Sequence, residues 1–375
     1  MIFTISAAKL AKACSRIKPL INDGRVAAIL GCVVLTCEDG FASIRGGNGD
    51  SYLTVPLGAA GENLEMLIPF TPLHIFTQGC PEGAEVEISS KPEEPNHVTL
   101  KSARRKARLG VPGALADYPL ATEREYPMMA QLPARDLATL LGRCLPYVYV
   151  GAGREMLAGV CLKRTDETLR GEASDSIGIA RVDALAQFVG ADVGPVIMPP
   201  DTAATVKDLC REFDGDVTLG MGESGFIIKL EGEDGETVMR APAIGATFPD
   251  ISPILFDAAP DAPTLPRNAT LQAVSRISGM IARDTTKTLW LTSGDGALRI
   301  VGKAEGALSE EEIETAGTLE YTQTAPMIAR ALSTFDGDTV TLTSGNNGAA
   351  WRFADPVDQS IVVMVSGLRS GAAPK

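Results

Sequence analysis

Two glycine-rich segments are the first places where residue spacing could support chemistry. Gly220 to Gly225 satisfies G-x-G-x-x-G, which binds a dinucleotide where it joins a strand to a helix. Here it stands between two strand-like segments, so it predicts a hairpin turn instead. The segment from Gly296 to Lys303 resembles a phosphate-binding loop, but it is one residue too long, and Ala304 replaces the hydroxyl that would hold Mg²⁺. Neither segment therefore predicts a nucleotide site.

Residues that ligate metals or act as nucleophiles are few and scattered. His74 and His97 are the only histidines, and no set of nucleophile, histidine and carboxylate stands out. The seven cysteines form no C-x-x-C motif, which favours buried free thiols over a zinc site or a disulfide framework. We expect no catalytic residue, no metal and no cofactor. An acidic α+β enzyme stays an alternative, because catalytic carboxylates need no motif, and a deep polar pocket with strongly perturbed acids would support it.

Basic residues recur at matching places, although the net charge is −13. Lys9, Lys12 and Arg16 fall at i, i+3 and i+7, so they share one helix face beside an apolar stripe. Similar segments further along carry Arg143 and Arg276. Ordinary solvated helix charge explains any single one of these residues equally well. Their recurrence points to a nucleic-acid surface, because binding depends on where the positive charge lies rather than on its sum.

A repeated pattern accounts for the helices that carry these cations. A short strand followed by an amphipathic helix begins near Phe3, Leu132 and Leu265. A second landmark, Phe213-Asp214-Gly215-Asp216, returns as Phe335-Asp336-Gly337-Asp338, and glycine suits the end of a helix. A weaker copy is Cys80-Pro81-Glu82-Gly83. The shared order predicts an α+β protein of three repeated domains, at residues 1–126, 127–256 and 257–375, rather than one large domain.

Within each domain we expect a strand, a helix, several strands, a second helix and further strands. The second helices are expected at 71–79, 201–213 and 325–335. Strands are expected at 28–36, 41–45, 98–101, 156–163, 225–230, 288–292, 297–301 and 360–365. The acidic run Glu310-Glu311-Glu312 is most simply a solvated loop. No segment approaches the roughly 18 unbroken apolar residues of a membrane-spanning helix, so we expect a cytoplasmic protein with no membrane partner.

Several strings along the chain together resemble the bacterial β sliding clamp, the processivity subunit of the replicative DNA polymerase III, as a divergent member. The strings are Ile29-Leu30-Gly31, Cys80-Pro81-Glu82-Gly83-Ala84-Glu85-Val86, Ala116-Asp117-Tyr118-Pro119, Phe248-Pro249-Asp250 and Val362-Val363-Met364. The resemblance implies clamp-type domains, each with two helices packed on antiparallel sheets, that close a ring in a head-to-tail homodimer. It implies a non-catalytic DNA sliding clamp that encircles duplex DNA, tethers the polymerase and other factors, and confers processivity in DNA replication. The alternative is a clamp-like protein-binding scaffold that no longer encircles DNA.

The resemblance and the recurring cations together define three sets of candidate residues. The ring lining would contact double-stranded DNA without reading its sequence. Its members are Lys12, Arg16, Arg25, Arg143, Lys207, Arg211, Arg276 and Arg330. A groove would take short linear peptides of the DNA polymerase, the clamp loader and repair proteins. Its members are Leu157, Ser174, Ile179, Pro249, Ile254, Val362, Val363 and Met364. The dimer seam would pair Met280 and Ile281 with the strand around Leu109.

Three departures from the family pattern concern the groove. The usual Thr-Asp-Gly-His-Arg-Leu string reads Ser174-Asp175-Ser176-Ile177-Gly178-Ile179, so the groove arginine is missing. Pro253 stands where a further arginine is expected. The closing Met-Pro-Met-Arg reads Met364-Val365-Ser366-Gly367, and an extension over 369–375 follows. We infer that the apolar slot is retained while its polar rim and its peptide preference have changed.

Overall fold

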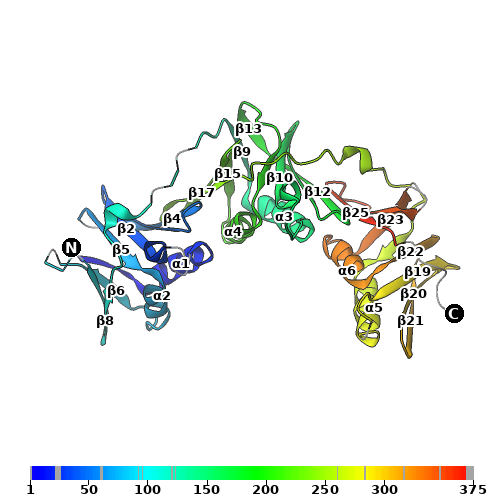
Figure 1. Cartoon of the computed structure of the whole chain (residues 1–375), viewed down its shortest axis with the longest axis horizontal. Coiled ribbons are helices and arrows are strands. Elements are labelled where there is room, and N and C mark those ends of the chain that lie inside the picture. Colours follow the sequence, from blue (N-terminus) through cyan, green and yellow to red (C-terminus); the bar gives the residue numbers. More distant parts are fainter. Residues whose placement is uncertain are drawn as a thin grey trace. The chain divides into compact units, whose positions relative to one another are not determined.

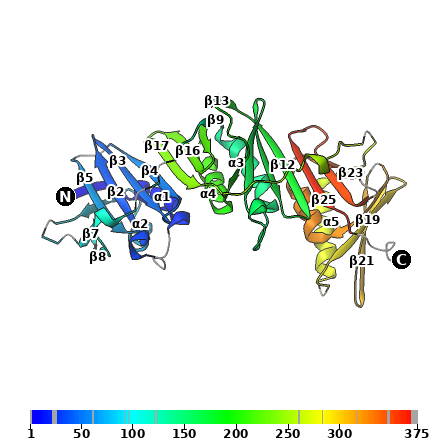
Figure 2. The same cartoon turned by 45° about the horizontal axis from the view of Figure 1, so that its top comes forward.

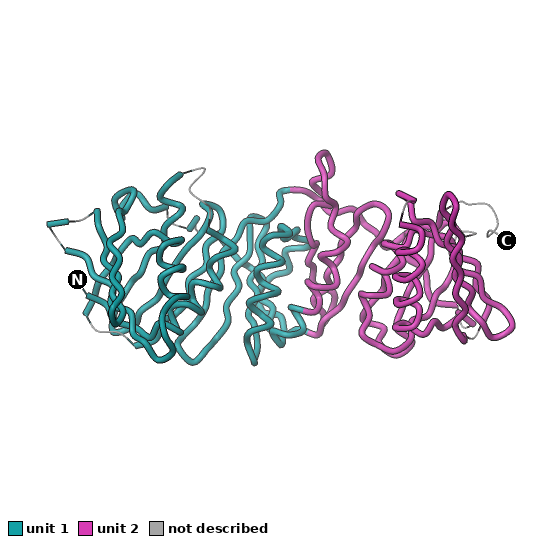
Figure 3. The backbone as a smooth tube through the Cα atoms, turned by 90° about the horizontal axis from the view of Figure 1, so that it is seen from below, with its two compact units in different colours: residues 1–138, 186–245 teal, residues 139–185, 246–375 magenta. Residues whose placement is uncertain are grey.

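The computed structural model of the chain describes residues 2–21, 27–59, 62–91, 93–94, 96–119, 121–122, 124–259, 261–282, 284–315, 317–345 and 348–368. It separates into two compact units (Figure 3). Unit 1 comprises Met1–Ala138 and Ala186–Gly245, and unit 2 comprises Thr139–Leu185 and Ala246–Lys375. The expected domain boundaries do not coincide with these units, and they stay a prediction.

Nearly the same order of elements occurs three times along the chain (Figure 1), with one extra strand before the second helix of the second repeat. This recurrence confirms the predicted three-fold α+β repeat. The first repeat contains β1 (Ile2–Ser6), α1 (Ala7–Ile17), β2 (Cys32–Glu38), β3 (Phe41–Gly47), β4 (Tyr52–Ala59), β5 (Leu64–Pro69), α2 (Phe70–Gln78), β6 (Glu85–Ser89), β7 (His97–Ser102) and β8 (Arg105–Gly110). The second contains β9 (Met128–Pro133), α3 (Ala134–Cys144), β10 (Val160–Thr165), β11 (Thr168–Ser174), β12 (Gly178–Leu185), β13 (Gln187–Gly190), β14 (Val196–Met198), α4 (Pro200–Arg211), β15 (Asp216–Gly222), β16 (Gly225–Gly232) and β17 (Gly235–Pro242). The third contains β18 (Thr264–Pro266), α5 (Arg267–Met280), β19 (Thr288–Gly294), β20 (Ala297–Ala304), β21 (Ala307–Glu314), β22 (Leu319–Thr324), α6 (Ala325–Ser333), β23 (Thr339–Gly345), β24 (Ala350–Ala354) and β25 (Ile361–Ser366).

The first helix of each repeat packs on a sheet position that has no side chain. On α1 the buried residues Leu10, Cys14 and Ile17 form one stripe, as the apolar spacing predicts. A Cβ atom added at Gly46 on β3 would lie 2.5 Å from Ile17 Cγ2. Added Cβ atoms at Gly171 on β11 and Gly302 on β20 would likewise lie 2.5 Å from Leu140 and from Ile277. The missing side chains therefore let the three helices approach their sheets closely.

Hydrogen-bonded strands join neighbouring repeats within each unit (Figure 2). In unit 1, β4 of the first repeat pairs antiparallel with β17 of the second, and the sheet order is β13-β9-β15-β16-β17-β4-β3-β2-β5. In unit 2, β12 of the second repeat pairs antiparallel with β25 of the third, and the strands run β10-β11-β12-β25-β24-β23-β18. The other two sheets run β1-β6-β7-β8 and β21-β20-β19-β22, so β8 and β21 are edge strands. Inside a unit, α1 packs with α2, and α5 packs with α6.

The acidic run was predicted to be a loop, and this prediction was wrong. It belongs to β21, which pairs with β20 from Ala307 to Glu314. The alternation of half-buried and exposed residues along β21 is that of a strand with one solvated face. The G-x-G-x-x-G segment forms the β15–β16 hairpin, with Gly222 opposite Gly225, as predicted. Two of the expected strands begin late, because 28–31 and 155–157 are short 3₁₀ turns.

Membrane-spanning helices and metal-binding clusters are both absent from the described part of the chain. It holds no helix that is long and apolar enough to span a membrane. The same residues contain no group of three or more His, Cys, Asp or Glu side chains placed to hold a metal ion. All seven cysteines are free thiols, and six of them are buried.

Candidate functional site

Three of the predicted groove residues lie side by side on adjacent strands of unit 2. Ser174 on β11 is directly opposite Ile179 on β12, and Ile179 is directly opposite Met364 on β25. Directly paired residues share one face of a sheet, and neighbouring strands are about 4.8 Å apart. The hydroxyl of Ser174 donates a hydrogen bond to the carbonyl of Gly178 at 3.1 Å, which closes the β11–β12 turn. We call Ser174, Ile179 and Met364 the Ile179 row.

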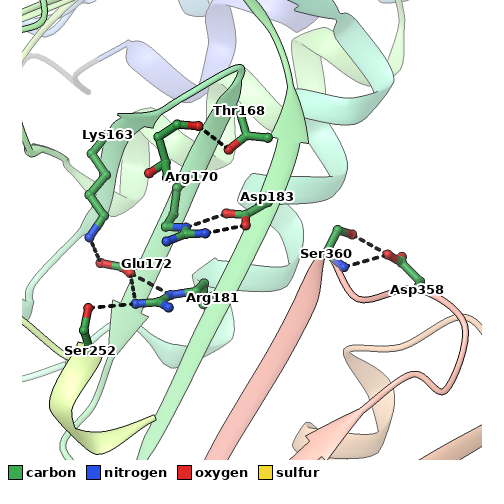
Figure 4. Close-up of polar contacts among 10 residues, drawn as sticks. Lys163, Thr168, Arg170, Glu172, Arg181, Asp183, Ser252, Asp358 and Ser360 are labelled. Atoms are coloured by element: carbon green, nitrogen blue, oxygen red, sulfur yellow. Dashed lines mark hydrogen bonds and ion pairs between the residues drawn. The ribbon is translucent and has the colours of Figure 1, made fainter. Parts of the chain in front are cut away.

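A network of charged side chains lies next to the Ile179 row on the same face of the sheet (Figure 4). Glu172 and Arg181, which are directly opposite each other, are each two residues from the row along their strands. Glu172 is 1% exposed, and its carboxylate accepts hydrogen bonds at 2.8 Å from Lys163 Nζ and from Arg181 Nε. Beside it, Arg170 donates two hydrogen bonds of 2.6 Å to Asp183. Burying a carboxylate is costly unless cations and hydrogen bonds compensate, and here two cations do so. This charged cluster was not foreseen, and the partners of Glu172 are only visible once the strands are paired.

The segment that follows β17 lies against this charged cluster. Arg181 Nη2 is 3.4 Å from the hydroxyl of Ser252 (Figure 4). Hydrogen bonds from the backbone N–H and the hydroxyl of Ser252 lower the pKa of Asp250, which also feels the positive charge of Lys163 and Arg181. Ile254, in the same turn, is 50% exposed. Arg181 thus contacts the turn Ser252–Ile254, which contains the predicted groove residue Ile254. The predicted groove residue Pro249 precedes this turn and is exposed.

A second short turn is tied to the β11–β12 hairpin. Leu157 is buried in the 3₁₀ turn Glu155–Leu157. Arg154, which precedes this turn, donates a hydrogen bond to the hydroxyl of Ser176. The hairpin therefore connects the predicted groove residue Leu157 to the Ile179 row.

The two predicted groove residues next to Met364 on β25 point in different directions. Val362 is half-buried and lies directly opposite Arg181, on the face of the Ile179 row. Val363 is fully buried and lies opposite Ala180 and Phe353, on the other face. Successive side chains of a strand alternate between faces, so Val363 packs in the core beneath the row and is not part of its surface.

Gly178, which stands in place of the missing groove arginine, leaves space that is filled by the side chain of Arg330 from helix α6. A Cβ atom added at Gly178 would lie 2.5 Å from Arg330 Nη2 and 3.0 Å from the ring of Tyr147. Arg330, on α6, donates a hydrogen bond of 2.5 Å to Asp175 and one of 3.1 Å to the carbonyl of Pro146, and its guanidinium lies 4.3 Å from the centre of the Tyr147 ring. Burial raises the pKa of Asp175, but hydrogen bonds from Arg330 and from the backbone of the hairpin lower it by more. Arg330 was predicted to face DNA, but here its side chain is 18% exposed and holds the hairpin.

Two of the predicted lining arginines bridge successive repeats. Arg16, at the end of α1, donates a hydrogen bond of 2.8 Å to Glu212, directly after α4, and lies 4.7 Å from the centre of the Phe213 ring. Arg143, at the end of α3, donates one of 2.6 Å to Asp336, shortly after α6. The two arginine side chains are only 11% and 15% exposed. Each cation is therefore largely covered and neutralised by the second-helix end of the next repeat.

The remaining predicted lining residues differ in exposure. Lys207 is 20% exposed and pairs with Asp208 at 3.2 Å, whereas Arg211 is 62% exposed and 4.0 Å from the same carboxylate. Lys12 is exposed and borders a cavity of about 380 Å³. Carboxylates also line this cavity: Glu212, Asp214, Glu231, Glu233 and Asp234. Arg25 lies outside the described residues.

Among the residues that the structure describes, no acidic group has the raised pKa that would support the enzyme alternative. Among the described residues, the carboxyl groups with a perturbed pKa all have it lowered, and hydrogen bonds account for the lowering. They are Asp175, Asp250, Asp284, Glu310 and Glu311. A cavity of about 820 Å³ lies in unit 2 and is lined by other residues, among them Asp261, Glu320 and Trp351.

Comparison with known proteins gives a match over the whole chain. No family model matches. The chain is 23% identical over 372 residues to the β sliding clamp of Pseudomonas aeruginosa, which covers 97% of this chain and 99% of that protein. It is a divergent relative of the β sliding clamps. The β sliding clamp of Chlamydia pneumoniae is 24% identical over 172 residues, 46% of this chain and 45% of that protein.

Solved sliding clamps share the fold. The Pseudomonas aeruginosa clamp solved with griselimycin has a TM-score of 0.90 at 21% identity, over 99% of this chain and 100% of that one. A Caulobacter crescentus β sliding clamp has a TM-score of 0.88 at 19% identity, with the same coverage. The three-repeat α+β fold is therefore that of a sliding clamp.

Two edge strands of this clamp relative carry opposite charge. On β8, Arg105, Lys106 and Arg108 are exposed, and Leu109 is half-buried. On β21, Glu310, Glu312 and Glu314 are exposed. Of the predicted seam residues near β21, Met280 is 70% exposed, while Ile281 is fully buried within its own chain. Met280 and Leu109 are thus available for contact with a second copy, and Ile281 packs in the core.

Proposed function

We propose that this chain is a DNA sliding clamp, which encircles duplex DNA and tethers a replicative DNA polymerase without a catalytic step of its own. The observation that carries this proposal is the match in sequence and in fold over almost the entire chain. DNA and a DNA polymerase are accordingly its partners. The proposed place of action is the cytoplasm.

The joints between repeats support a head-to-tail homodimer. At each joint within the chain, the third strand after the first helix pairs with the last strand of the next repeat, as β4 with β17 and β12 with β25. The third repeat has the equivalent strand β21, and the first repeat has the equivalent strand β8, but both are sheet edges. By the same rule, β21 pairs with β8 of a second copy. Two such contacts between copies close a ring of six domains, with proposed boundaries at residues 1–126, 127–256 and 257–375.

Charge complementarity supports the same pairing. An exposed edge strand is a template for pairing with another chain, and charges on it select the partner. The basic side chains of β8 and the acidic side chains of β21 repel their own kind and attract each other. Head-to-tail contacts are therefore favoured over head-to-head contacts. The exposed Met280 would add apolar contact beside Leu109.

Contact between the proposed lining and DNA would be weak and independent of sequence. Phosphates of duplex DNA attract Lys and Arg without reading the bases. Here Arg16, Arg143 and Arg276 are already paired with carboxylates, so DNA must compete for them. Arg276 is 58% exposed, and an exposed ion pair contributes only about 0–1 kcal/mol, so competition for Arg276 is possible but gives little net affinity. Arg16 and Arg143 are largely covered by their partners and are less accessible to DNA. Encirclement would then supply the lifetime on DNA.

The Ile179 row and its surroundings would bind short peptides of the polymerase, the clamp loader and repair proteins. An extended peptide is held by apolar anchors in a slot with polar contacts at its edge. Ile254 is 50% exposed and Val362 is half-buried, so these two supply apolar surface in unit 2. Ile179, Leu157 and Met364 are covered in the free chain, with 9%, 8% and 2% of their surface exposed. Arg181 and Lys163 supply cations beside it, which favours a peptide with an acidic residue next to its anchors.

The test is retention on circular DNA. Protein loaded by a clamp loader and ATP onto nicked circular DNA should stay bound during gel filtration at high salt, and it should be released when the DNA is linearised. Equal loss from both forms would contradict encirclement. It would favour the second candidate, a protein-binding scaffold, which the neutralised lining cations also support.

A further inference from the structure

The ion pairs at the joints follow a repeated rule. An arginine near the end of the first helix of one repeat reaches the acidic segment after the second helix of the next repeat. Arg16 contacts Glu212 in this way at 2.8 Å, and Arg143 contacts Asp336 at 2.6 Å. Both pairs accompany a strand pairing at the same joint, β4 with β17 and β12 with β25.

Both halves of a third such contact are present in the chain but have no equivalent partner within it. Arg276 is the matching arginine of the third repeat, on α5. Its side chain is 58% exposed and pairs with Glu311 of β21, within its own repeat. The segment after α2 is the matching acceptor in the first repeat. Its Glu82 aligns with Asp336 and with Asp214, which is two residues after Glu212, the partner of Arg16. Glu82 is exposed on the surface.

We propose that Arg276 of one copy binds Glu82 of a second copy, as the third member of the series formed by Arg16 and Arg143. This inference rests on the proposed head-to-tail ring. The occupant of the surface around Glu82 is then a second copy of this chain. In the single chain Arg276 is held by Glu311, and at the seam it exchanges that carboxylate for Glu82 of the second copy. The exchange keeps the cation paired in both states, so its desolvation is compensated throughout.

The seam contact differs from the two contacts within the chain in one respect. Arg16 and Arg143 are 11% and 15% exposed, because their partner segments are covalently part of the same chain and cover them. Arg276 keeps 58% of its side chain exposed in the single chain. Each chain of such a ring contains two covalently continuous joints between repeats, whereas the corresponding joint between chains is non-covalent.

Charge reversal tests the pair directly. Arg276→Glu and Glu82→Arg, each alone, should weaken dimerisation at least tenfold, because each places two like charges together at both seams. The double variant restores opposite charges and should return the dissociation constant to within about threefold of the unchanged protein. Sedimentation of the full chain over a concentration series measures these constants. Arg211→Glu is the matched control, since its side chain is 62% exposed at the end of α4 and it makes the same change in net charge.

The outcomes separate this inference from the ring itself. Two results would overturn the Arg276–Glu82 pair and leave the ring intact. Either the single reversals leave the dissociation constant of the dimer unchanged, or the double variant does not recover it. An unchanged protein that stays monomeric at micromolar concentration overturns the ring and the pair together. Folding is checked by the thermal midpoint of each variant at a concentration at which every protein is monomeric, because weaker dimerisation by itself lowers the midpoint of a dimer. Under that condition the midpoint should move little, because both side chains lie at the surface.

Discussion

Replacing Glu172 with glutamine should destabilise unit 2 far more than the loss of an exposed ion pair would. Its carboxylate is 1% exposed and is held at 2.8 Å by both Lys163 and Arg181. Glutamine keeps the shape and can accept a hydrogen bond, but it leaves two cations without a counter-charge. Removing one partner of a fully buried ion pair costs about 3–5 kcal/mol.

The expected loss is smaller than that range for a structural reason. Lys163 and Arg181 keep 23% and 16% of their side-chain surface in water, so solvent compensates part of their charge. We therefore expect the free energy of unfolding to fall by about 2–3 kcal/mol. For a domain of roughly 150–250 residues, each kcal/mol lowers the thermal midpoint by about 2–4 °C, so the midpoint should fall by about 4–12 °C.

Urea and thermal unfolding of the full chain measure this loss, and Asp183→Asn is the matched control. Asp183 is 22% exposed and accepts two hydrogen bonds from a single cation, Arg170, so its loss should cost less than that of Glu172, about 1–2 kcal/mol. Replacing Glu172, Lys163 and Arg181 together with apolar residues of similar size should recover most of the stability, because paired buried ions are only weakly stabilising. A cost below about 1 kcal/mol for Glu172→Gln, with an unchanged urea slope, would refute the reasoning that this carboxylate is the counter-charge of both cations.

Three further outcomes follow from other contacts. Gly171→Val should lower the free energy of unfolding in urea by about 1–3 kcal/mol, because its Cβ would lie 2.5 Å from Leu140. Gly215→Ala is the control: no atom lies within 4 Å of its Cβ position, so this variant measures only the cost of a positive φ. The pKa of Asp175 is lowered in the folded chain, so the stabilisation by its carboxylate is present above the ordinary pKa near 4 and is lost as the pH falls through the lower, folded pKa. Asp175→Asn should therefore remove this part of the acid dependence of the unfolding midpoint. An unchanged acid profile in this variant would contradict the expectation. Ile254→Asp, at a side chain that is 50% exposed, should reduce binding of a fluorescent polymerase-derived peptide at least tenfold without changing dimerisation. Unaltered peptide affinity would exclude Ile254 from the binding surface.

The local elements of the fold were largely predictable because their causes are close in sequence. The apolar stripe of Leu10, Cys14 and Ile17 predicts the first helix without any knowledge of what it packs against. Recurrence of the Phe-Asp-Gly landmark predicted the repeats, and the structure confirms them. Glu310–Glu312 misled the prediction because charge alone favours a loop. Their strand is stabilised by pairing with β20, and by Arg276 and Arg299 on neighbouring elements.

The candidate site was predictable only in part. Five of the predicted groove residues lie on the adjacent strands β11, β12 and β25, but the face on which each side chain lies depends on strand register. Their role in peptide binding stays a prediction. This register places Val362 beside Arg181 and turns Val363 into the core. The missing groove arginine is readable from Gly178 in the sequence, whereas the approach of Arg330 from α6 is not.

What the sequence alone determined is the repeat, its helices and its hairpins, because periodicity, capping and turn residues act over a few positions. What only the tertiary structure decided is the state of each charge. Arg16, Arg143 and Arg330 look like free cations on helix faces, yet each meets a carboxylate that is more than a hundred residues away along the chain. An ion pair depends on the distance between two atoms in space, and no local pattern carries that distance.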